Sequence, residues 1–152
     1  MNLIKYPNPL LKQISKPVTQ TAWPIEKLED FGNLLTGKMF EWKGIGLSAI
    51  QVGDPIRVFV MERENGNFCI FVNPEMEIVD SGPISIEEGC LSIPYFFTPV
   101  DRASKIKVTN FNGYPSYQYE TILEGKDAIV FQHELDHLNG ITIKDKEHVK
   151  GR

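Results

Sequence analysis

The sequence predicts an α+β fold, in which antiparallel sheet occupies the middle of the chain and a helix precedes and follows it. Three observations lead to this prediction. Apolar residues follow roughly helical spacing over residues 25–42. A proline-free segment that ends before Gly140 covers 125–139, and β-rich runs, some of them joined across Asn-Gly dipeptides, lie between the two. With 152 residues, 41% of them hydrophobic, and no internal repeat or linker, we expect a single domain over residues 1–152.

The first helix is predicted over residues 25–42. Pro24 suits the start of a helix, and Glu26 and Asp30 place negative charge near its N-terminus. Lys43-Gly44 then ends the pattern. The apolar residues that recur at roughly helical spacing are Ile25, Leu28, Phe31, Leu34, Leu35 and Met39.

The first β-hairpin is predicted from Ile56–Met61 and Phe68–Val72, which join across Asn65-Gly66. An Asn-Gly pair favours a tight hairpin turn because both residues tolerate positive φ. Short strands are expected next, at residues 75–79 and 83–87.

A second hairpin is predicted from Lys105–Phe111 and Tyr114–Ile122, around a turn at Asn112-Gly113. Ile106 and Val108 alternate with lysines in its first strand. One face of that strand is therefore expected to be buried.

The second helix is predicted over residues 125–139, because this segment contains no proline and is followed by Gly140, a common residue just past a helix end. Apolar residues lie on several of its sides, which indicates a buried helix. They are Ala128, Ile129, Val130, Phe131, Leu135 and Leu138.

Composition excludes several classes of protein. The 16 basic and 20 acidic residues give a net charge of −4, so we expect no stable nucleic-acid binding and no attraction to an anionic membrane. The longest apolar run, Phe68–Val72, has five residues, whereas roughly 20 are needed to span a bilayer. The N-terminus lacks the apolar core of a secretory signal, so a cytoplasmic location is expected.

A metal-binding pattern lies on the second predicted helix. His133 and His137 are four residues apart in HELDH, so both imidazoles project from one face and can reach one cation. Glu134 between them is placed to act as a general base for water on that cation. Two hydrogen-bonded helix histidines would be the simpler interpretation, but burying them with a glutamate costs several kcal/mol unless partners satisfy them.

A catalytic metal site needs a third protein ligand and one open position. Downstream, Glu147 and His148 lie in a short tail with no recognisable structural context. Upstream, Cys90 follows a glycine at the end of a predicted strand, and a thiolate is a strong metal ligand. We therefore predict Cys90 as the third ligand, and Cys69, in the strand run FCIFV, as a small buried hydrophobe without a disulfide.

Three blocks, in this order, resemble the signature of the peptide deformylase family: Gly44–Gln51 (GIGLSAIQ), Glu88–Ser92 (EGCLS) and His133–His137 (HELDH). The resemblance implies an α+β fold with antiparallel sheets around a central HExxH helix. It also implies Fe(II) as the working metal, with zinc, nickel or cobalt able to substitute. The implied reaction removes the N-formyl group from the N-terminal formylmethionine of nascent polypeptides and releases formate.

The resemblance also implies roles for individual residues. Glu134 would take a proton from metal-bound water and deliver it to the leaving nitrogen. Gln51 and the backbone N–H of Leu91 would donate hydrogen bonds to the developing oxyanion. The metal ligands would be Cys90, His133 and His137.

Substrate contacts follow from the same resemblance. The substrate backbone would pair with residues 45–47 as an added strand, and the methionine side chain would enter an apolar slot, although plain core packing is an alternative for its lining residues. The implied substrate-binding residues are Ile45, Gly46, Leu47, Gly89, Ile129 and Val130. The residues implied to orient the metal ligands are Glu88, Arg102 and Asp136, with Arg102 paired to one of the two carboxylates.

The chain also departs from the family pattern. Ser48 stands where alanine is usual, a change that we expect to be tolerated. Tyr95, Phe96 and Phe97 stand where many relatives have glycine or charged residues, which leaves the preference beyond formylmethionine open. The chain stops soon after HELDHLNG, and we expect a shortened, phage-like member that acts in a host cytoplasm and contacts the ribosome only transiently.

Two other functions stay open at this point. A HExxH protease would take its third ligand from downstream, so Cys90 could be replaced without loss of metal. A non-catalytic, metal-stabilised binding module is the second alternative. Glu134 and Gln51 argue against it, because a structural site needs neither a base nor an oxyanion donor.

Overall fold

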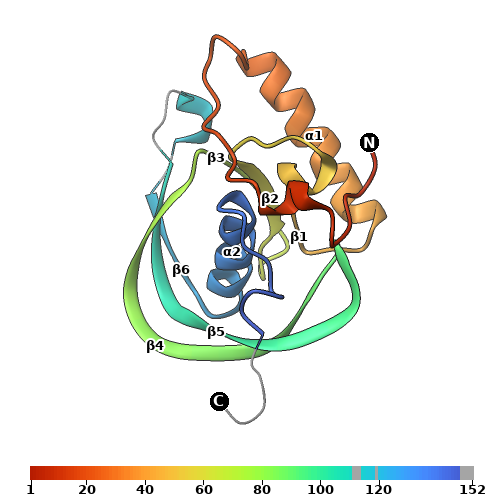
Figure 1. Ribbon diagram of the computed structural model, residues 1–152. Coiled ribbons are helices and arrows are strands. Elements are labelled where there is room, and N and C mark those ends of the chain that lie inside the picture. Colours follow the sequence, from red (N-terminus) through yellow and green to blue (C-terminus); the bar gives the residue numbers. More distant parts are fainter. Residues whose placement is uncertain (111–113, 119, 148–152) are drawn as a thin grey trace.

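The computed structural model describes residues 1–110, 114–118 and 120–147. It has the predicted α+β architecture, built from two three-stranded antiparallel sheets and two α-helices (Figure 1). Helix α2 (Gly125–Leu138) lies in the centre, where it contacts strands of both sheets. Helix α1 (Ile25–Glu41) packs on the other face of the first sheet, so the layers run α1, first sheet, α2, second sheet.

The first sheet contains β1 (Gly46–Ser48), β2 (Val58–Glu62) and β3 (Phe68–Val72), in that spatial order. The predicted hairpin between β2 and β3 is confirmed. Its turn is closed by the amide of Arg63, which donates to the carbonyl of Asn67 (2.7 Å), and Gly66 adopts a φ of 85°. Strand β1 lies at the edge of the sheet and brings the GIGLSAIQ block next to α2.

The second sheet contains β4 (Glu75–Cys90), β5 (Ile93–Thr109) and β6 (Glu120–Glu124). β4 and β5 sweep around α2 as two long curved ribbons (Figure 1). The prediction of two short strands at 75–79 and 83–87 was wrong, since both belong to the continuous strand β4. The register of β4 against β5 shifts between Ile78 and Pro83. In this stretch the amide of Gly82 donates to Asp80 Oδ1, and regular pairing with β5 resumes at Pro83.

The predicted second hairpin is only partly right. β5 and β6 do pair antiparallel, but Thr109 lies opposite Glu120, and a short 3-10 helix at Pro115–Tyr117 occupies the expected start of the second strand. The predicted turn at Asn112-Gly113 lies outside the described residues. The buried face of β5 is confirmed through Ile106 and Val108, both fully buried.

The core has two main parts, one on each face of the first sheet. In the part between α1 and the first sheet, α1 contributes the buried residues Leu28, Leu35 and Met39. Between β2, β3 and α2, the rings of Phe59, Phe71 and Phe131 pack with centroids 4.9–5.2 Å apart. This aromatic cluster fixes α2, and with it the histidines, against the sheet.

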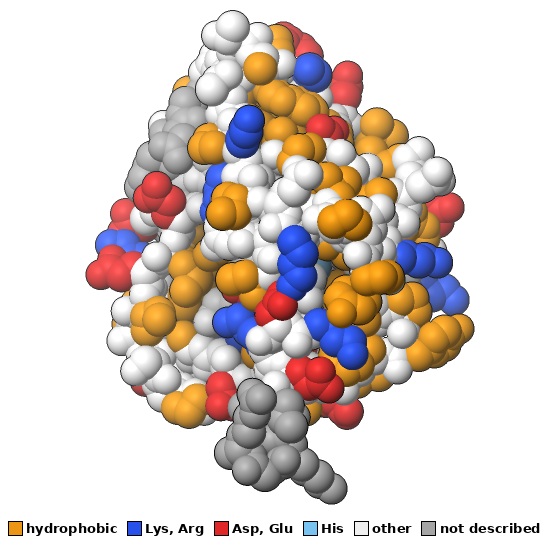
Figure 2. Space-filling model, viewed as in Figure 1, with side chains coloured by type: hydrophobic (Ala, Val, Ile, Leu, Met, Phe, Trp, Pro, Cys, Tyr) orange, Lys and Arg blue, Asp and Glu red, His pale blue; other side chains and the backbone are white. Residues whose placement is uncertain are grey.

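Both predicted helices are confirmed within one residue at their ends. Gly140, just beyond α2, adopts a φ of 73°, as expected for a residue that terminates a helix. No helix in the described ranges is long and apolar enough to cross a membrane. On the face shown in Figure 2, basic and acidic side chains are interspersed among hydrophobic ones.

Candidate metal centre and active site

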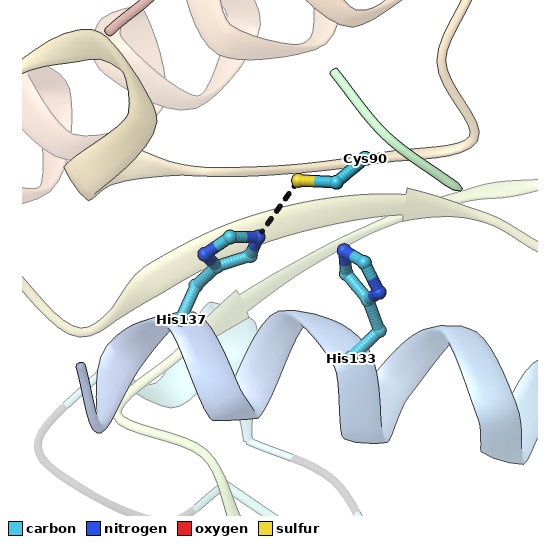
Figure 3. A group of neighbouring side chains, drawn as sticks. All are labelled: Cys90, His133 and His137. Atoms are coloured by element: carbon cyan, nitrogen blue, oxygen red, sulfur yellow. Dashed lines mark hydrogen bonds between the residues drawn. The ribbon is translucent and has the colours of Figure 1, made fainter. Parts of the chain in front are cut away.

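Three potential metal ligands converge where β4 meets α2. His133 and His137 rise from the same side of α2, one turn apart, and Cys90 approaches them from the end of β4 (Figure 3). Cys90 Sγ lies 3.4 Å from His137 Nε2, and one ligand atom from each residue falls within 4.8 Å of the others. In a tetrahedral zinc site with about 2.3 Å Zn–S and 2.0 Å Zn–N bonds, donor atoms lie about 3.5 Å apart. The three residues therefore fit a single divalent cation.

The fold explains this convergence. The aromatic cluster fixes α2, whose four-residue spacing puts both imidazoles on one face. β4 and β5 meet in a tight turn that pairs Cys90 with Ile93, after an irregularity between Gly89 and Cys90. Both cysteines are free thiols. Cys69 packs against the core but is only partly buried, and its thiol interacts with Arg63, so the prediction of a small buried hydrophobe is only partly right.

A buried ionic network orients His133. Its Nδ1 donates to Glu88 Oε1 (2.9 Å), which leaves Nε2 available to a cation. Arg102 binds both oxygens of Glu88 (2.9 and 2.8 Å) and also Asp136 (2.6 Å). The sequence predicted that Arg102 pairs with one of these carboxylates, and the structure shows that it binds both.

The two imidazoles of the cluster lie in different electrostatic environments. Burial lowers the pKa of His133, but hydrogen bonds to Cys90 and Glu88 and the charge of Glu134 outweigh burial and raise it to about 10. Burial, together with the charges of His133 and Arg102, holds the pKa of His137 well below its usual value, so this imidazole is neutral. Because a metal competes with protons for these nitrogens, the field that holds a proton on His133 also attracts a divalent cation.

Removing Arg102 should weaken both the fold and the metal site. Arg102→Leu leaves the buried Glu88 carboxylate without its main partner. Loss of one partner of a buried ion pair costs about 3–5 kcal/mol, and loss of a group that orients a ligand lowers metal affinity about 10–100-fold. Chemical unfolding and metal content after dialysis measure the two effects.

The control for this variant is Lys107→Leu, which removes an exposed ion pair with Glu120. It should leave stability and metal content nearly unchanged. Full metal occupancy in Arg102→Leu would contradict the orienting role of the network.

Glu134 is buried beside the metal ligands, and its Oε1 lies 4.0 Å from His133 Nε2. Burial raises the pKa of Glu134, against the charge of His133 and a hydrogen bond from Ser48. The backbone of Gly46 lies against this carboxylate, since a Cβ there would lie 2.6 Å from Glu134 Oε1. Only a glycine lets β1 approach so closely.

Gln51 reaches the cluster from the short 3-10 helix Ala49–Val52. Its Nε2 donates to Ser92 Oγ (3.0 Å) and lies 3.7 Å from Cys90 Sγ, while its Oε1 accepts from the amide of Ser48 (2.9 Å). No role was predicted for Ser92, and the contacts of Ser48 were not predicted, although each residue lies in one of the quoted blocks, EGCLS and GIGLSAIQ. The bonds from Ser48 to Glu134 and from Gln51 to Ser92 join residues far apart in the chain and leave no local pattern, whereas Ser48 and Gln51 form a capping box that the S-x-x-Q spacing could have indicated.

A cavity of about 550 Å³ opens beside the cluster and reaches His133 and Glu134. Leu91 lies on its wall, and Tyr95 and Phe97, which are 100% and 62% exposed, form part of its rim. Five of the six predicted substrate residues line it: Ile45, Gly46, Gly89, Ile129 and Val130. Leu47 differs, because its side chain is buried in the core under α1 and only its backbone remains for a ligand.

Comparisons with known proteins agree with this site. The family model for polypeptide deformylase matches residues 1–151. The chain belongs to the peptide deformylase family. A peptide deformylase from Wolinella succinogenes is 38% identical over 151 residues, covering 95% of this chain and 86% of that protein.

Solved deformylase structures share the fold. The crystal structure of peptide deformylase from Thermotoga maritima superposes with a TM-score of 0.88 at 37% identity, over 97% of each chain. A class I type b peptide deformylase from Acinetobacter baumannii, bound to Met-Ala-Ser, gives a TM-score of 0.86 at 30% identity, over 96% of this chain and 97% of that one.

Membership of the deformylase family makes this chain a metal-dependent hydrolase with peptide deformylase activity, whose metal site is Cys90, His133 and His137. The expectation of a shortened, phage-like form is not supported, because the match extends over nearly all of the Thermotoga maritima chain and the relatives named here are bacterial. The protease alternative needed a downstream ligand. Among the described residues the cluster contains Cys90 and not Glu147, and His148 lies outside them.

Proposed function

We propose that this deformylase hydrolyses the N-formyl group of formylmethionine at the start of nascent polypeptides and releases formate. The observation that carries the proposal is that three metal donors, a buried carboxylate and a side-chain amide converge beside one largely apolar cavity, whose wall includes Cys90 and His133. Amide hydrolysis needs an activated water, a proton carrier and donors for an oxyanion. This set of residues can supply all of these roles.

A divalent cation held by Cys90, His133 and His137 would polarise the formyl carbonyl and lower the pKa of a water molecule. Glu134, in a position to accept the proton of that water, passes it to the departing nitrogen. Gln51 Nε2, which faces the cluster, and the N–H of Leu91 donate to the developing oxyanion.

The substrate binds between β1 and the cavity. Strand β1 pairs with β2 on one side only within the described chain, so its other edge can accept an extended peptide. The methionine side chain enters the apolar part of the cavity beside Ile45, Ile129 and Val130. The Met-Ala-Ser complex of the Acinetobacter baumannii relative, a peptide that begins with methionine, supports this substrate class.

We propose Fe(II) as the working metal, with zinc, nickel or cobalt able to replace it. Because Fe(II) and a thiolate ligand are both open to oxidation, the iron form should lose activity in air faster than the nickel form. Turnover measured at intervals during aerobic incubation tests this, with anaerobic samples of both forms as controls. Equal lifetimes of the two forms in air would contradict iron as the source of air sensitivity.

Residues 1–152 are proposed to act as a single catalytic domain. The proposed substrates are made in the cytoplasm, so we place the enzyme there, with only transient contact with the ribosome.

A formate-release assay with formyl-Met-Ala-Ser tests the proposal. The enzyme is loaded anaerobically with Fe(II) or with Ni(II), and formate is measured against the unformylated peptide as a blank. We expect turnover with both ions. Folded protein that carries stoichiometric metal and releases no formate with either ion would overturn the proposed function.

A further inference from the structure

Ser48 contacts both residues that the proposed function uses for proton transfer and oxyanion binding. Its side chain is fully buried, and its hydroxyl donates to Glu134 Oε2 at 2.5 Å. Its backbone N–H donates to Gln51 Oε1 at 2.9 Å. Ser48 and Glu134 are 86 residues apart in sequence, so only the packing of β1 against α2 brings them together.

The hydroxyl of Ser48 distinguishes the two oxygens of the Glu134 carboxylate. Oε2 is held by Ser48, while Oε1 is directed to the side of His133 and Gly46. That side is where the metal cluster and the edge of β1 meet. The oxygen nearer the metal ligands is thus left to accept a proton, and a short hydrogen bond to a charged oxygen restricts rotation of the carboxylate.

The backbone of Ser48 fixes the second group. Because its N–H requires an acceptor, Gln51 must present Oε1 to it, and Nε2 is then turned toward Ser92 and Cys90. This contact defines which end of the amide faces the metal cluster. Ser48 itself is held by pairing with Phe59 of β2.

We propose that Ser48 is a positioning residue, which aligns the Glu134 carboxylate through its hydroxyl and the Gln51 amide through its backbone. The inference rests on the proposed function. An alanine here would retain the backbone hydrogen bond to the Gln51 side chain and lose the hydroxyl hydrogen bond to Glu134.

Ser48→Ala therefore isolates the hydroxyl contact. General base catalysis contributes about 10²–10⁴-fold, and partial loss of alignment should lower kcat about tenfold. KM should change by less than about twofold, because the hydroxyl is directed at the carboxylate and not at the substrate. Kinetics are measured on nickel-loaded protein with formyl-Met-Ala-Ser, and rates are expressed per bound metal.

Ser15→Ala is the matched control. Ser15 is also a buried serine, and its hydroxyl has no hydrogen-bond partner among the described residues. Ser15→Ala should retain the kcat, KM, metal content and melting temperature of the parent. Ser48→Ala should keep the metal content and the KM of the parent and lose kcat; its melting temperature is measured separately, because a buried hydrogen bond to Glu134 is removed.

A second readout does not depend on activity. In a crystal structure of nickel-loaded Ser48→Ala, the Glu134 carboxylate should rotate or occupy two conformers, whereas in the parent and in Ser15→Ala it should hold one. A parental kcat in Ser48→Ala, an unmoved carboxylate, or a loss explained entirely by lower metal content would overturn the positioning role. An inactive parent would instead refute the proposed function, so the two failures are distinguishable.

Discussion

Replacement of Glu134 by glutamine should abolish turnover while the metal stays bound. Glutamine has the same shape, and its carbonyl oxygen can still accept the hydrogen bond from Ser48. An amide, however, cannot take a proton from water at neutral pH. Since a general base contributes about 10²–10⁴-fold to such reactions, kcat on formyl-Met-Ala-Ser should fall by at least about 100-fold, with metal content measured by mass spectrometry unchanged.

Glu26→Gln provides the control for this prediction, since it makes the same chemical change at an exposed position in the first turn of α1. It should leave kcat and metal content at their parental values. A Glu134→Gln variant that keeps more than about a tenth of the parental kcat would show that another group accepts the proton.

Replacement of Cys90 by alanine should remove the metal. Cys90 supplies the only sulfur among the three clustered donors, and His133 and His137 alone leave the cation with two protein ligands. Loss of an outer-shell group already costs about 10–100-fold in metal affinity, so loss of a ligand should cost more than about 100-fold. Metal content after dialysis against a chelator and formate release should both fall to background.

Cys69→Ala is the matched control, because Cys69 is the second free cysteine and packs against the core away from the donor cluster. This variant should keep its metal and its turnover, with a modest loss of stability. Retention of stoichiometric metal by Cys90→Ala is the result that a HExxH protease with a downstream ligand predicts, and it would contradict the site described here.

Two of the three metal ligands were predictable because the information for them is local, whereas Cys90 was predicted from its own EGCLS context. HELDH places His133 and His137 on one face of a helix, and the apolar residues around them predicted the burial that the structure confirms for α2. The hairpin at Asn65-Gly66 was predictable for the same reason, since the dipeptide specifies its own turn.

Features set by distant contacts were not predictable in this way. Gly82-Pro83 resembles the end of a strand, but β4 pairs with β5 on both sides of it and therefore remains one strand. The 3-10 helix at Pro115–Tyr117 displaced the expected start of β6. The contacts of Ser48 and Ser92 depend on how β1, α2 and the β4–β5 turn meet, and no sequence pattern reports that arrangement.

The most direct test of the metal centre is X-ray absorption spectroscopy on the zinc-substituted protein. Convergence of Cys90, His133 and His137 on one ion predicts a first shell with one sulfur at about 2.3 Å, two imidazole nitrogens at about 2.0 Å and one further light atom. A first shell without sulfur, or one closed by a fourth protein ligand, would contradict a catalytic site built from these three residues.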